Sequence, residues 1–229
     1  MPVYIPTISL KPAFDGTPGG REKVVEEIRR ACEDMGFLTI TDHGVPDEIT
    51  DAMWKAGWNF FDLPAEEKTQ FTSEDEAKYP YGYTAFKGEV LQGGLDKEHG
   101  EETTIAPDLK ECFAVGPYNP ASGMPPPVLP ANPPEFGPAV TAYYKELEQL
   151  GARLLSLMAS ALELPPDWFE DKIDRHRCAL RLLYVPRCHG IAGCVWVCVW
   201  VCVGVCVCVG VCGCSCGCMS VGVMAMMMT

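Results

Sequence analysis

Charge is missing from the C-terminal part of this 229-residue chain. No Asp, Glu, Lys or Arg follows Arg187, so the formal net charge of −13 belongs to the residues before position 188. Because nucleic-acid phosphates require clusters of Lys and Arg, this acidic balance excludes nucleic acid as an expected partner. The chain also lacks an N-terminal basic segment followed by a long apolar run, which predicts no signal peptide and a cytoplasmic location.

Cysteine is scarce before residue 190 and abundant after it. The first part has four widely scattered cysteines, as is typical of a reducing cytosol rather than of a disulfide framework: Cys32, Cys112, Cys178 and Cys188. Residues 194–218 instead contain nine Cys and nine Val in near-strict alternation. Since a GTGTGT repeat encodes alternating Val and Cys, we interpret residues 191–229 as a low-complexity tail translated from a dinucleotide repeat.

The composition of this tail leads to three structural hypotheses. Alternation of Val with Cys, Trp or Gly over residues 194–212 favours an extended strand, because β-branched Val packs well on a pleated sheet. Residues 191–211 are an uncharged run of 21 residues, long enough for a membrane-tethering helix. A thiol cluster for soft metal ions such as Zn²⁺ or Cu(I) is the third hypothesis, with the ligands Cys212, Cys214, Cys216 and Cys218. We expect the strand.

Hydrophobic periodicity predicts a mixed α+β fold before the tail. Helices are expected over residues 21–35, 47–62 and 136–164, with a short helix opening at Pro64 and another short segment at 167–173. Strands are expected over residues 3–10, 37–41 and 178–185. Residues 73–135 are rich in Gly, Pro and acidic residues and show little periodicity, so we expect them to be irregular.

Seven segments, taken in order, resemble one family of enzymes. They are IPTISL, GFLTITDHGVP, FFDLPAEEK, DLKECF, AYYKELEQLGARLL, LPPDWF and LRLLYVP. Together they are similar to the isopenicillin-N-synthase-like oxygenases, which are Fe(II)/2-oxoglutarate-dependent dioxygenases. The resemblance implies N-terminal helices followed by the first strands of an incomplete double-stranded β-helix, or jelly roll. It divides the chain into a non-haem dioxygenase N-terminal region (1–121), a connector with the long helix and first core strand (122–190), and the tail (191–229).

The resemblance also implies a chemistry whose residues are missing here. In the family, His-x-Asp and a distant His hold Fe(II), and a later Arg-x-Ser pair holds 2-oxoglutarate, while small molecules are oxidised. These ligands lie after the strand that matches LRLLYVP. Here nothing after Arg187 is Asp, Glu or Arg, and His189 is followed by Gly190 and Ile191. We therefore expect a truncated, catalytically inactive chain that has no catalytic or metal-ligating residues and binds neither cofactor.

Two candidate sites remain in the sequence. The family strand carries Tyr immediately before its Pro, where it contacts the ligands. In this chain Val185 takes that place and Tyr184 lies one position earlier, so Tyr184 is a candidate for substrate binding that faces the opposite side of the strand. His99 and Glu101 form a His-x-acid pair within an acidic loop, and they are the candidate ligands of a replacement metal site.

Other polar residues are expected to be structural. His43 lies in a turn between a strand and a helix, and His176 lies between basic residues, which predicts a surface position. Asp108, Lys110 and Glu111 match a family loop near the active-site rim, where we expect them to position the backbone.

Three functional hypotheses follow from these patterns. The first is an inactive oxygenase relative. The second is an active oxidoreductase with improvised ligands, which requires His99 and Glu101 to meet another His. The third is a non-catalytic binding or membrane-tethered module, which requires an apolar helix over residues 191–211.

Overall fold

The computed structural model describes residues 5–75, 79–89, 107–186, 194–201, 205–210 and 222–227, the last three ranges as backbone. Within these residues the helices are α1 (Gly20–Asp34), α2 (Asp47–Phe61), α3 (Ala65–Lys68), α4 (Phe136–Ala161) and α5 (Glu170–Ile173). Short 3₁₀ turns occupy η1 (Lys11–Ala13), η2 (Thr69–Phe71) and η3 (Pro120–Ser122).

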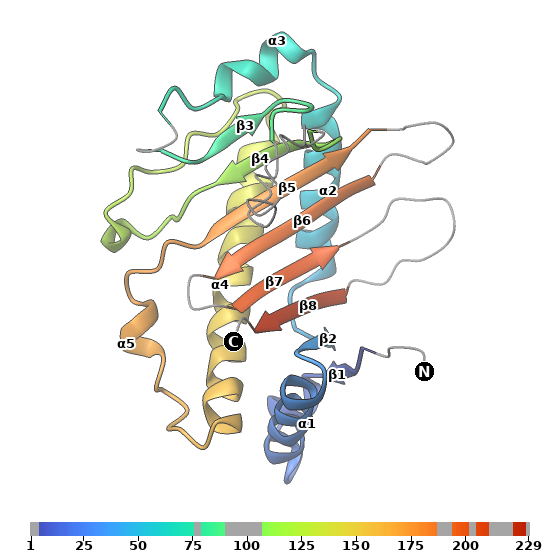
Figure 1. Cartoon of the computed structure of the whole chain (residues 1–229), viewed down its shortest axis with the longest axis vertical. Helices are drawn as coiled ribbons and strands as arrows, with labels where there is room; N and C mark the ends of the chain where they lie inside the picture. Colours follow the sequence, from blue (N-terminus) through green and yellow to red (C-terminus); the bar gives the residue numbers. More distant parts are fainter. Residues whose placement is uncertain are drawn as a thin grey trace, which may run out of the picture.

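The strands of the described residues form one sheet. They are β1 (Thr7–Ser9), β2 (Phe37–Thr41), β3 (Gly82–Thr84), β4 (Glu111–Val115), β5 (Ala179–Val185), β6 (Cys194–Val201), β7 (Val205–Gly210) and β8 (Gly222–Met227). Their order across the sheet is β1-β2-β8-β7-β6-β5-β4-β3. The β1–β2 pair is parallel and every other neighbouring pair is antiparallel. Helices α2 and α4 lie behind this sheet in Figure 1.

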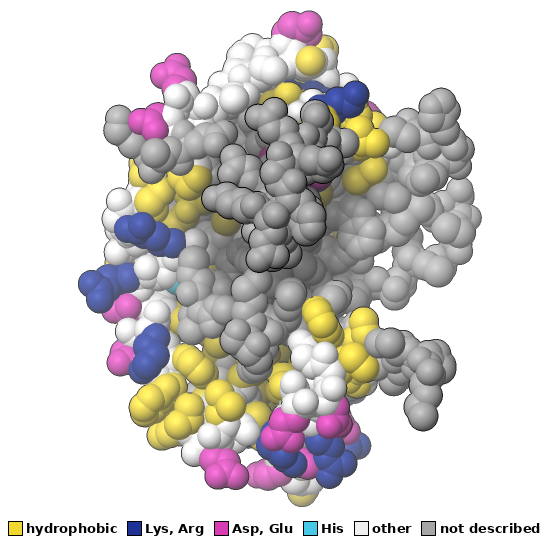
Figure 2. Space-filling view, in the orientation of Figure 1, with side chains coloured by type: hydrophobic (Ala, Val, Ile, Leu, Met, Phe, Trp, Pro, Cys, Tyr) yellow, Lys and Arg dark blue, Asp and Glu magenta, His cyan; other side chains and the backbone are white. Residues whose placement is uncertain are grey.

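The position of helix α1 follows from an apolar stripe, and its end follows from a glycine. Val24, Ile28 and Ala31 recur at helical spacing and are buried, as the sequence predicts. Gly36 has a φ of 75°, a left-handed conformation that glycine adopts without strain and that ends helices. The opposite face is solvated, and Figure 2 shows its acidic and basic side chains gathered at the lower end of the molecule. There Arg29 bridges Glu26 and Glu33 at 2.8 and 2.7 Å.

Helix α4 is the central support of the core. Its predicted stripe is buried as expected: Val140, Tyr143, Tyr144, Leu147, Leu150, Leu154, Leu155 and Met158. The sequence predicted a helix to residue 164, but α4 ends at Ala161. Leu162 therefore lies beyond the buried stripe and is exposed. The prediction that residues 73–135 are irregular was also wrong in part, because this range contains β3 and β4. Buried strands of three to five residues are too short to show a period.

The tail enters the sheet as strands. β6 pairs with the whole of β5, from Ala179↔Trp200 to Val185↔Cys194, and β8 pairs with β2. This confirms the extended structure predicted within residues 194–212, whereas the Met-rich β8 was not predicted. Among the described residues there is no helix long and apolar enough to cross a membrane. The helix that membrane tethering through 191–211 required is therefore replaced, at 194–201 and 205–210, by β6 and β7.

Alternation along β5 defines two faces of the sheet. Leu180 and Leu182 are fully buried in the core cluster beneath the helices, so Arg181 lies on the opposite face. We call this opposite face the Arg181 face. β4 and β5 pair with each other although they fall on different sides of residue 121. The division of the chain at residue 121 stays a prediction from the sequence.

Candidate functional site

A cleft with both polar and apolar lining residues lies on the Arg181 face. Its volume is about 400 Å³, and it lies over β3, β4 and β5. Its lining is mixed: Ser73, Pro80, Tyr81, Gly82, Tyr83, Thr84, Glu89, Ala114, Ala179 and Arg181. Gly82 is required at this place because its φ is 109° and a Cβ would meet the carbonyl oxygen of Phe71.

Four charged residues at the cleft neutralise one another. The Glu89 carboxylate pairs with the Arg181 guanidinium and, at 2.9 Å, with Lys110 Nζ. Lys110 also donates to Asp108 at 2.7 Å. Burial opposes ionisation of Glu89, but its two cationic neighbours outweigh burial and lower its pKa. Because two acids face two bases, the cluster has no net positive charge to attract an anionic ligand.

Cys112 is the buried thiol nearest to this cluster. Burial raises the pKa of Cys112, and the neighbouring Arg181 opposes the change only in part. The thiol is therefore protonated at neutral pH and is a poor nucleophile. Cys112 acts here as a small apolar residue of β4.

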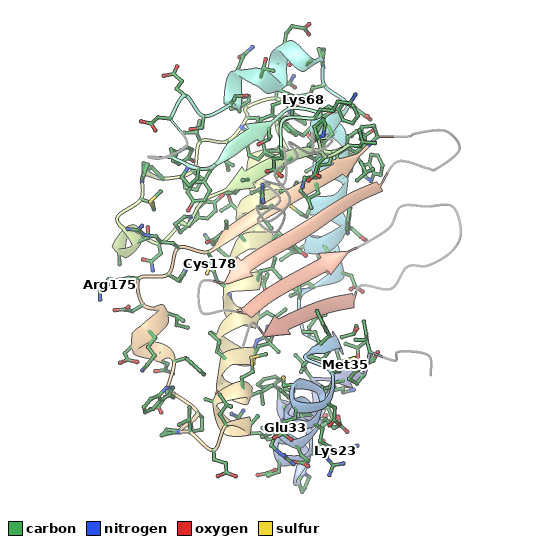
Figure 3. All side chains as sticks on the ribbon, viewed as in Figure 1. Lys23, Glu33, Met35, Lys68, Arg175 and Cys178 are labelled. Atoms are coloured by element: carbon green, nitrogen blue, oxygen red, sulfur yellow. The ribbon has the colours of Figure 1, made fainter. Side chains whose placement is uncertain are left out.

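A second polar group lies on the helix side of the same strands. Lys68 Nζ donates to the Phe61 carbonyl oxygen at 2.8 Å and to Glu111 Oε2 at 2.7 Å, near the upper end of the sheet in Figure 3. The Tyr83 hydroxyl donates to the same Glu111 oxygen at 2.7 Å. Burial, reinforced by the bond to Glu111, raises the pKa of Tyr83. These contacts join α2, α3, β3 and β4, so Glu111 positions backbone as the sequence predicts.

Tyr184 lies in the helix-side core. Its ring stacks on Phe61 with centroids 5.3 Å apart, and it meets the edge of Trp58 at 5.7 Å. Three positions separate Tyr184 from Arg181, so the two residues face opposite sides of β5. Substrate binding by Tyr184 stays a prediction, and its place beside α2 gives the ring a packing role.

His43 has the structural role that the sequence indicates. Its Nδ1 accepts a hydrogen bond from the Val45 backbone N–H at 3.1 Å. The imidazole is half-buried, and burial lowers the pKa of His43. The ring therefore stabilises the turn between β2 and α2 as a neutral group.

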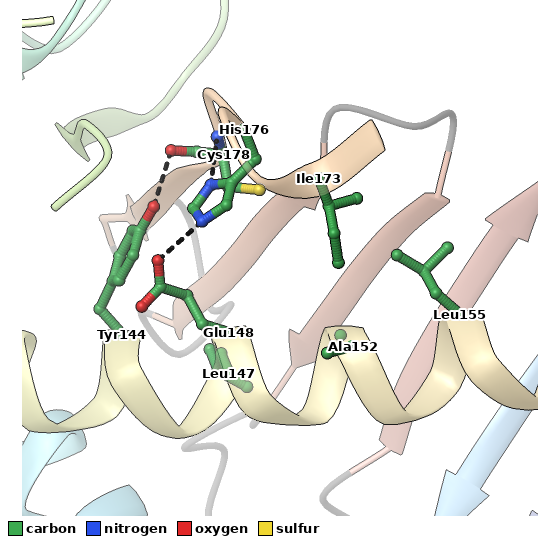
Figure 4. A pocket seen from close by; sticks show the side chains of 9 residues that line it. Tyr144, Leu147, Glu148, Ala152, Leu155, Ile173, His176 and Cys178 are labelled. Carbon is green, nitrogen blue, oxygen red and sulfur yellow. Dashed lines mark hydrogen bonds and ion pairs between the residues drawn. The ribbon is translucent and has the colours of Figure 1, made fainter. Parts of the chain in front are cut away.

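His176 is not the surface residue that its basic neighbours suggested. Only 15% of its side chain is exposed, and Nε2 lies 3.0 Å from Glu148 Oε1 on α4 (Figure 4). Hydrogen bonds with Cys178 and Glu148 raise the pKa of His176 to about 10. The Tyr144 hydroxyl donates to the Cys178 carbonyl oxygen at 3.0 Å and closes the same small pocket. Sequence reasoning missed this pair because Glu148 is distant along the chain.

The described residues do not fit a three-ligand iron site. Among the side chains that the structure places, no three of His, Cys, Asp and Glu come together where they could hold a metal ion. His43 and His176 are engaged by backbone and by Glu148. The candidate pair His99 and Glu101, like His189, lies outside the described residues.

Solved structures of 2-oxoglutarate oxygenases share the fold of this chain. A 2OG-Fe(II) oxygenase family protein from Caulobacter crescentus superposes with a TM-score of 0.65 at 24% identity, over 82% of this chain and 58% of that one. T7H from Neurospora crassa, solved with alpha-KG, also gives 0.65, at 21% identity over 80% of this chain and 54% of that chain. At these identities the likeness establishes the fold alone.

Sequence comparison establishes the family. A protein-family model, that of the N-terminal region of non-haem dioxygenases in morphine synthesis, matches residues 5–138. The chain therefore belongs to the Fe(II)/2-oxoglutarate dioxygenase family, as the motifs predicted. It is 34% identical to the 2-oxoglutarate-dependent dioxygenase traH of Penicillium crustosum over 191 residues, covering 80% of this chain and 56% of that protein. It is 27% identical to leucoanthocyanidin dioxygenase of Perilla frutescens over 187 residues, covering 80% and 48%. The chain thus spans about half the length of these relatives.

Proposed function

We propose that this 229-residue chain is a catalytically inactive relative of the Fe(II)/2-oxoglutarate dioxygenases and binds neither Fe(II) at a facial triad nor 2-oxoglutarate. One observation carries the proposal: no Asp, Glu or Arg follows Arg187. The resemblance places the iron carboxylate, the second His and the cosubstrate Arg after the strand that corresponds to β5. A facial triad requires a carboxylate with its two histidines.

The arrangement of the cleft supports the same proposal. Arg181 lines the cleft, and its guanidinium is engaged by Glu89. Displacing Glu89 would leave a partly buried carboxylate without one of its two cationic partners, which costs free energy. The cluster therefore disfavours binding of a dicarboxylate such as 2-oxoglutarate at this place.

A second candidate function is binding of a small neutral molecule without chemistry. The cleft volume of about 400 Å³ falls within the range of small-molecule sites. T7H, a structural neighbour, has been solved with thymine. Tyr81 and Thr84 line the cleft and offer the aromatic and hydroxyl groups that such a ligand needs.

The test is turnover by the full chain, because tail thiols bind Fe(II) adventitiously and make binding alone uninformative. The reduced protein receives Fe(II) anaerobically, then 2-oxoglutarate and oxygen, and succinate release and oxygen consumption are measured. The Perilla leucoanthocyanidin dioxygenase is the positive control. We expect the rate of the buffer blank. Stoichiometric succinate that depends on both Fe(II) and 2-oxoglutarate would overturn the proposal.

Two variants separate the remaining outcomes. If turnover occurs and disappears in His99→Ala and Glu101→Gln, the hypothesis of improvised ligands replaces ours. If turnover persists in both variants, other residues hold the iron. Small-molecule binding at the cleft is followed independently by calorimetric titration of thymine into the full chain, and Thr84→Val at the cleft should weaken any binding.

A further inference from the structure

Cys178 shares a small pocket with two groups that can activate a thiol. The pocket lies between α4 and the segment that joins α5 to β5, where the imidazole of His176 and the carboxylate of Glu148 line it together with Cys178 (Figure 4). A thiol, an imidazole and a carboxylate are the parts of an activated nucleophile, because the imidazole exchanges the proton and the carboxylate orients the imidazole. The proposed function uses none of these three residues.

His176 carries a proton at neutral pH. Hydrogen bonding with the Cys178 side chain is the largest of the causes that raise the pKa of His176 to about 10, and the bond with Glu148 comes next. Nε2 lies 3.0 Å from Glu148 Oε1. Nδ1 lies 3.5 Å from the Cys178 backbone nitrogen, too far for a strong hydrogen bond, so its proton is available to the sulfur. A cation beside a thiol favours the reactive thiolate.

The backbone of Cys178 is fixed, and the residue is sheltered from solvent. The Tyr144 hydroxyl donates to the Cys178 carbonyl oxygen at 3.0 Å. Only 5% of Cys178 is exposed, whereas Cys32 on α1 is partly exposed. Burial raises the pKa of Cys32 and of Cys112. Exposure alone would make Cys32 the most reactive of these three thiols, so a faster reaction at Cys178 requires a chemical cause.

The size and walls of the pocket select the reagent. Its volume is about 30 Å³, which holds about two water-sized groups. The side chains of Leu147, Leu155 and Ile173 make its walls largely apolar, and Ala152 at its rim is exposed. Hydrogen peroxide fits this space, because it has two oxygen atoms and no charge. Larger oxidants such as peptide disulfides do not fit.

We propose that Cys178 is a peroxide-reactive thiol, with His176 as its proton donor and Glu148 as the residue that positions His176. The thiolate sulfur attacks one peroxide oxygen, so that an S–O bond forms and the O–O bond breaks. The leaving hydroxide takes the proton of the imidazolium and departs as water. Sulfur is thereby oxidised by two electrons, the peroxide is reduced, and the product is a sulfenic acid at Cys178. This modification is independent of the proposed lack of oxygenase activity.

The experiment treats the full reduced chain with less than one equivalent of hydrogen peroxide in the presence of dimedone, which reacts with sulfenic acids. Peptide mass spectrometry follows labelling at Cys178, Cys32 and Cys112 separately from the cysteines after residue 187. We expect Cys178 to be labelled fastest of the three. Labelling of Cys32 as fast as Cys178 would overturn the proposal, because exposure alone would then explain the reaction.

Variants assign the two supporting roles. His176→Gln should slow labelling at Cys178 by roughly 100-fold, the size of a general-acid contribution, and leave Cys32 unchanged. Glu148→Gln should lower the pH above which labelling at Cys178 declines, because it removes one of the bonds that keep His176 protonated. A merely structural effect of Glu148 would instead lower the rate equally at every pH. That result, or an unchanged rate in His176→Gln, would contradict the assignment.

Entry through the pocket is tested with a variant that keeps Cys178, His176 and Glu148. Ala152→Phe at the rim should close the entrance and slow labelling at Cys178. Ala52→Phe, at an exposed position of α2, is the matched control and should not slow it. The bulkier tert-butyl hydroperoxide should label Cys178 more slowly than hydrogen peroxide. Equal rates in the two alanine variants, or faster labelling by the bulkier peroxide, would overturn the pocket as the reactive site. Urea midpoints establish that each variant is folded.

Discussion

The buried ion pair between Lys68 and Glu111 allows a quantitative prediction of stability. The Lys68 side chain is 6% exposed and that of Glu111 is 12%, and Nζ lies 2.7 Å from Oε2. Lys68→Met keeps the length and apolar volume of the stem but leaves the Glu111 carboxylate with Tyr83 as its described partner. Breaking a buried pair from one side costs about 3–5 kcal/mol. Because domains are stable by only about 5–15 kcal/mol, this loss is a large share of the total.

The matched control is an exposed pair in the same chain. Lys172 and Asp171 are 2.7 Å apart, but their side chains are 42% and 79% exposed. Lys172→Met should therefore cost at most about 1 kcal/mol. The double variant Lys68→Met/Glu111→Leu removes both buried charges, so it should cost less than Lys68→Met alone.

The assay is equilibrium urea unfolding of the full reduced chain, followed by far-ultraviolet circular dichroism. If the variants share one slope of unfolding free energy against urea concentration, differences between their midpoints measure differences in stability. If Lys68→Met unfolds at the same midpoint as Lys172→Met, the pair contributes no more than a surface contact. If the double variant is less stable than Lys68→Met, the carboxylate is not the source of the cost. Either result would refute the reasoning from burial.

Three further predictions concern other parts of the chain. The pKa of His176 is raised to about 10, so its pairing with Glu148 stabilises the fold fully below pH 6.5, and this contribution declines as pH rises through 10. His176→Gln should thus lose about 1–3 kcal/mol at pH 6, and the deficit in urea midpoint should shrink by pH 10. Deleting residues 191–229 leaves the β5 and β2 edges unpaired, so the product should bind hydrophobic dye and aggregate; a monodisperse, cooperatively melting monomer would contradict this. Gly36→Val should cost more than about 1 kcal/mol by thermal melting, because φ is positive there.

Long periodic elements could be predicted from the sequence, and contacts between distant residues could not. The α4 stripe and β2 were recognised because many residues repeat with one period, and the end of α1 followed from Gly36. The end of α4 did not follow from the sequence, because the apolar stripe continues past Ala161. β3 and β4 are too short to show a period, and their place in the sheet depends on pairing of β4 with β5 and of β3 with β4. The Lys68–Glu111 and His176–Glu148 pairs join residues far apart in the chain, which no local pattern signals.

The tail separates what the fold requires of a sequence from what the chemistry requires. Strands placed between β5 and β2 must pair with their neighbours through the backbone and must carry apolar residues on the face toward the helices. β6 and β7 pair in this way, and they have Val at every second position. That requirement constrains one face only. The other face of the same strands decides the chemistry, and there β6 carries Cys and Trp at the positions opposite Arg181 and Leu183 rather than His and a carboxylate. Pairing of the tail is therefore an argument about stability, whereas the proposed inactivity rests on which residue types the sequence supplies after β5.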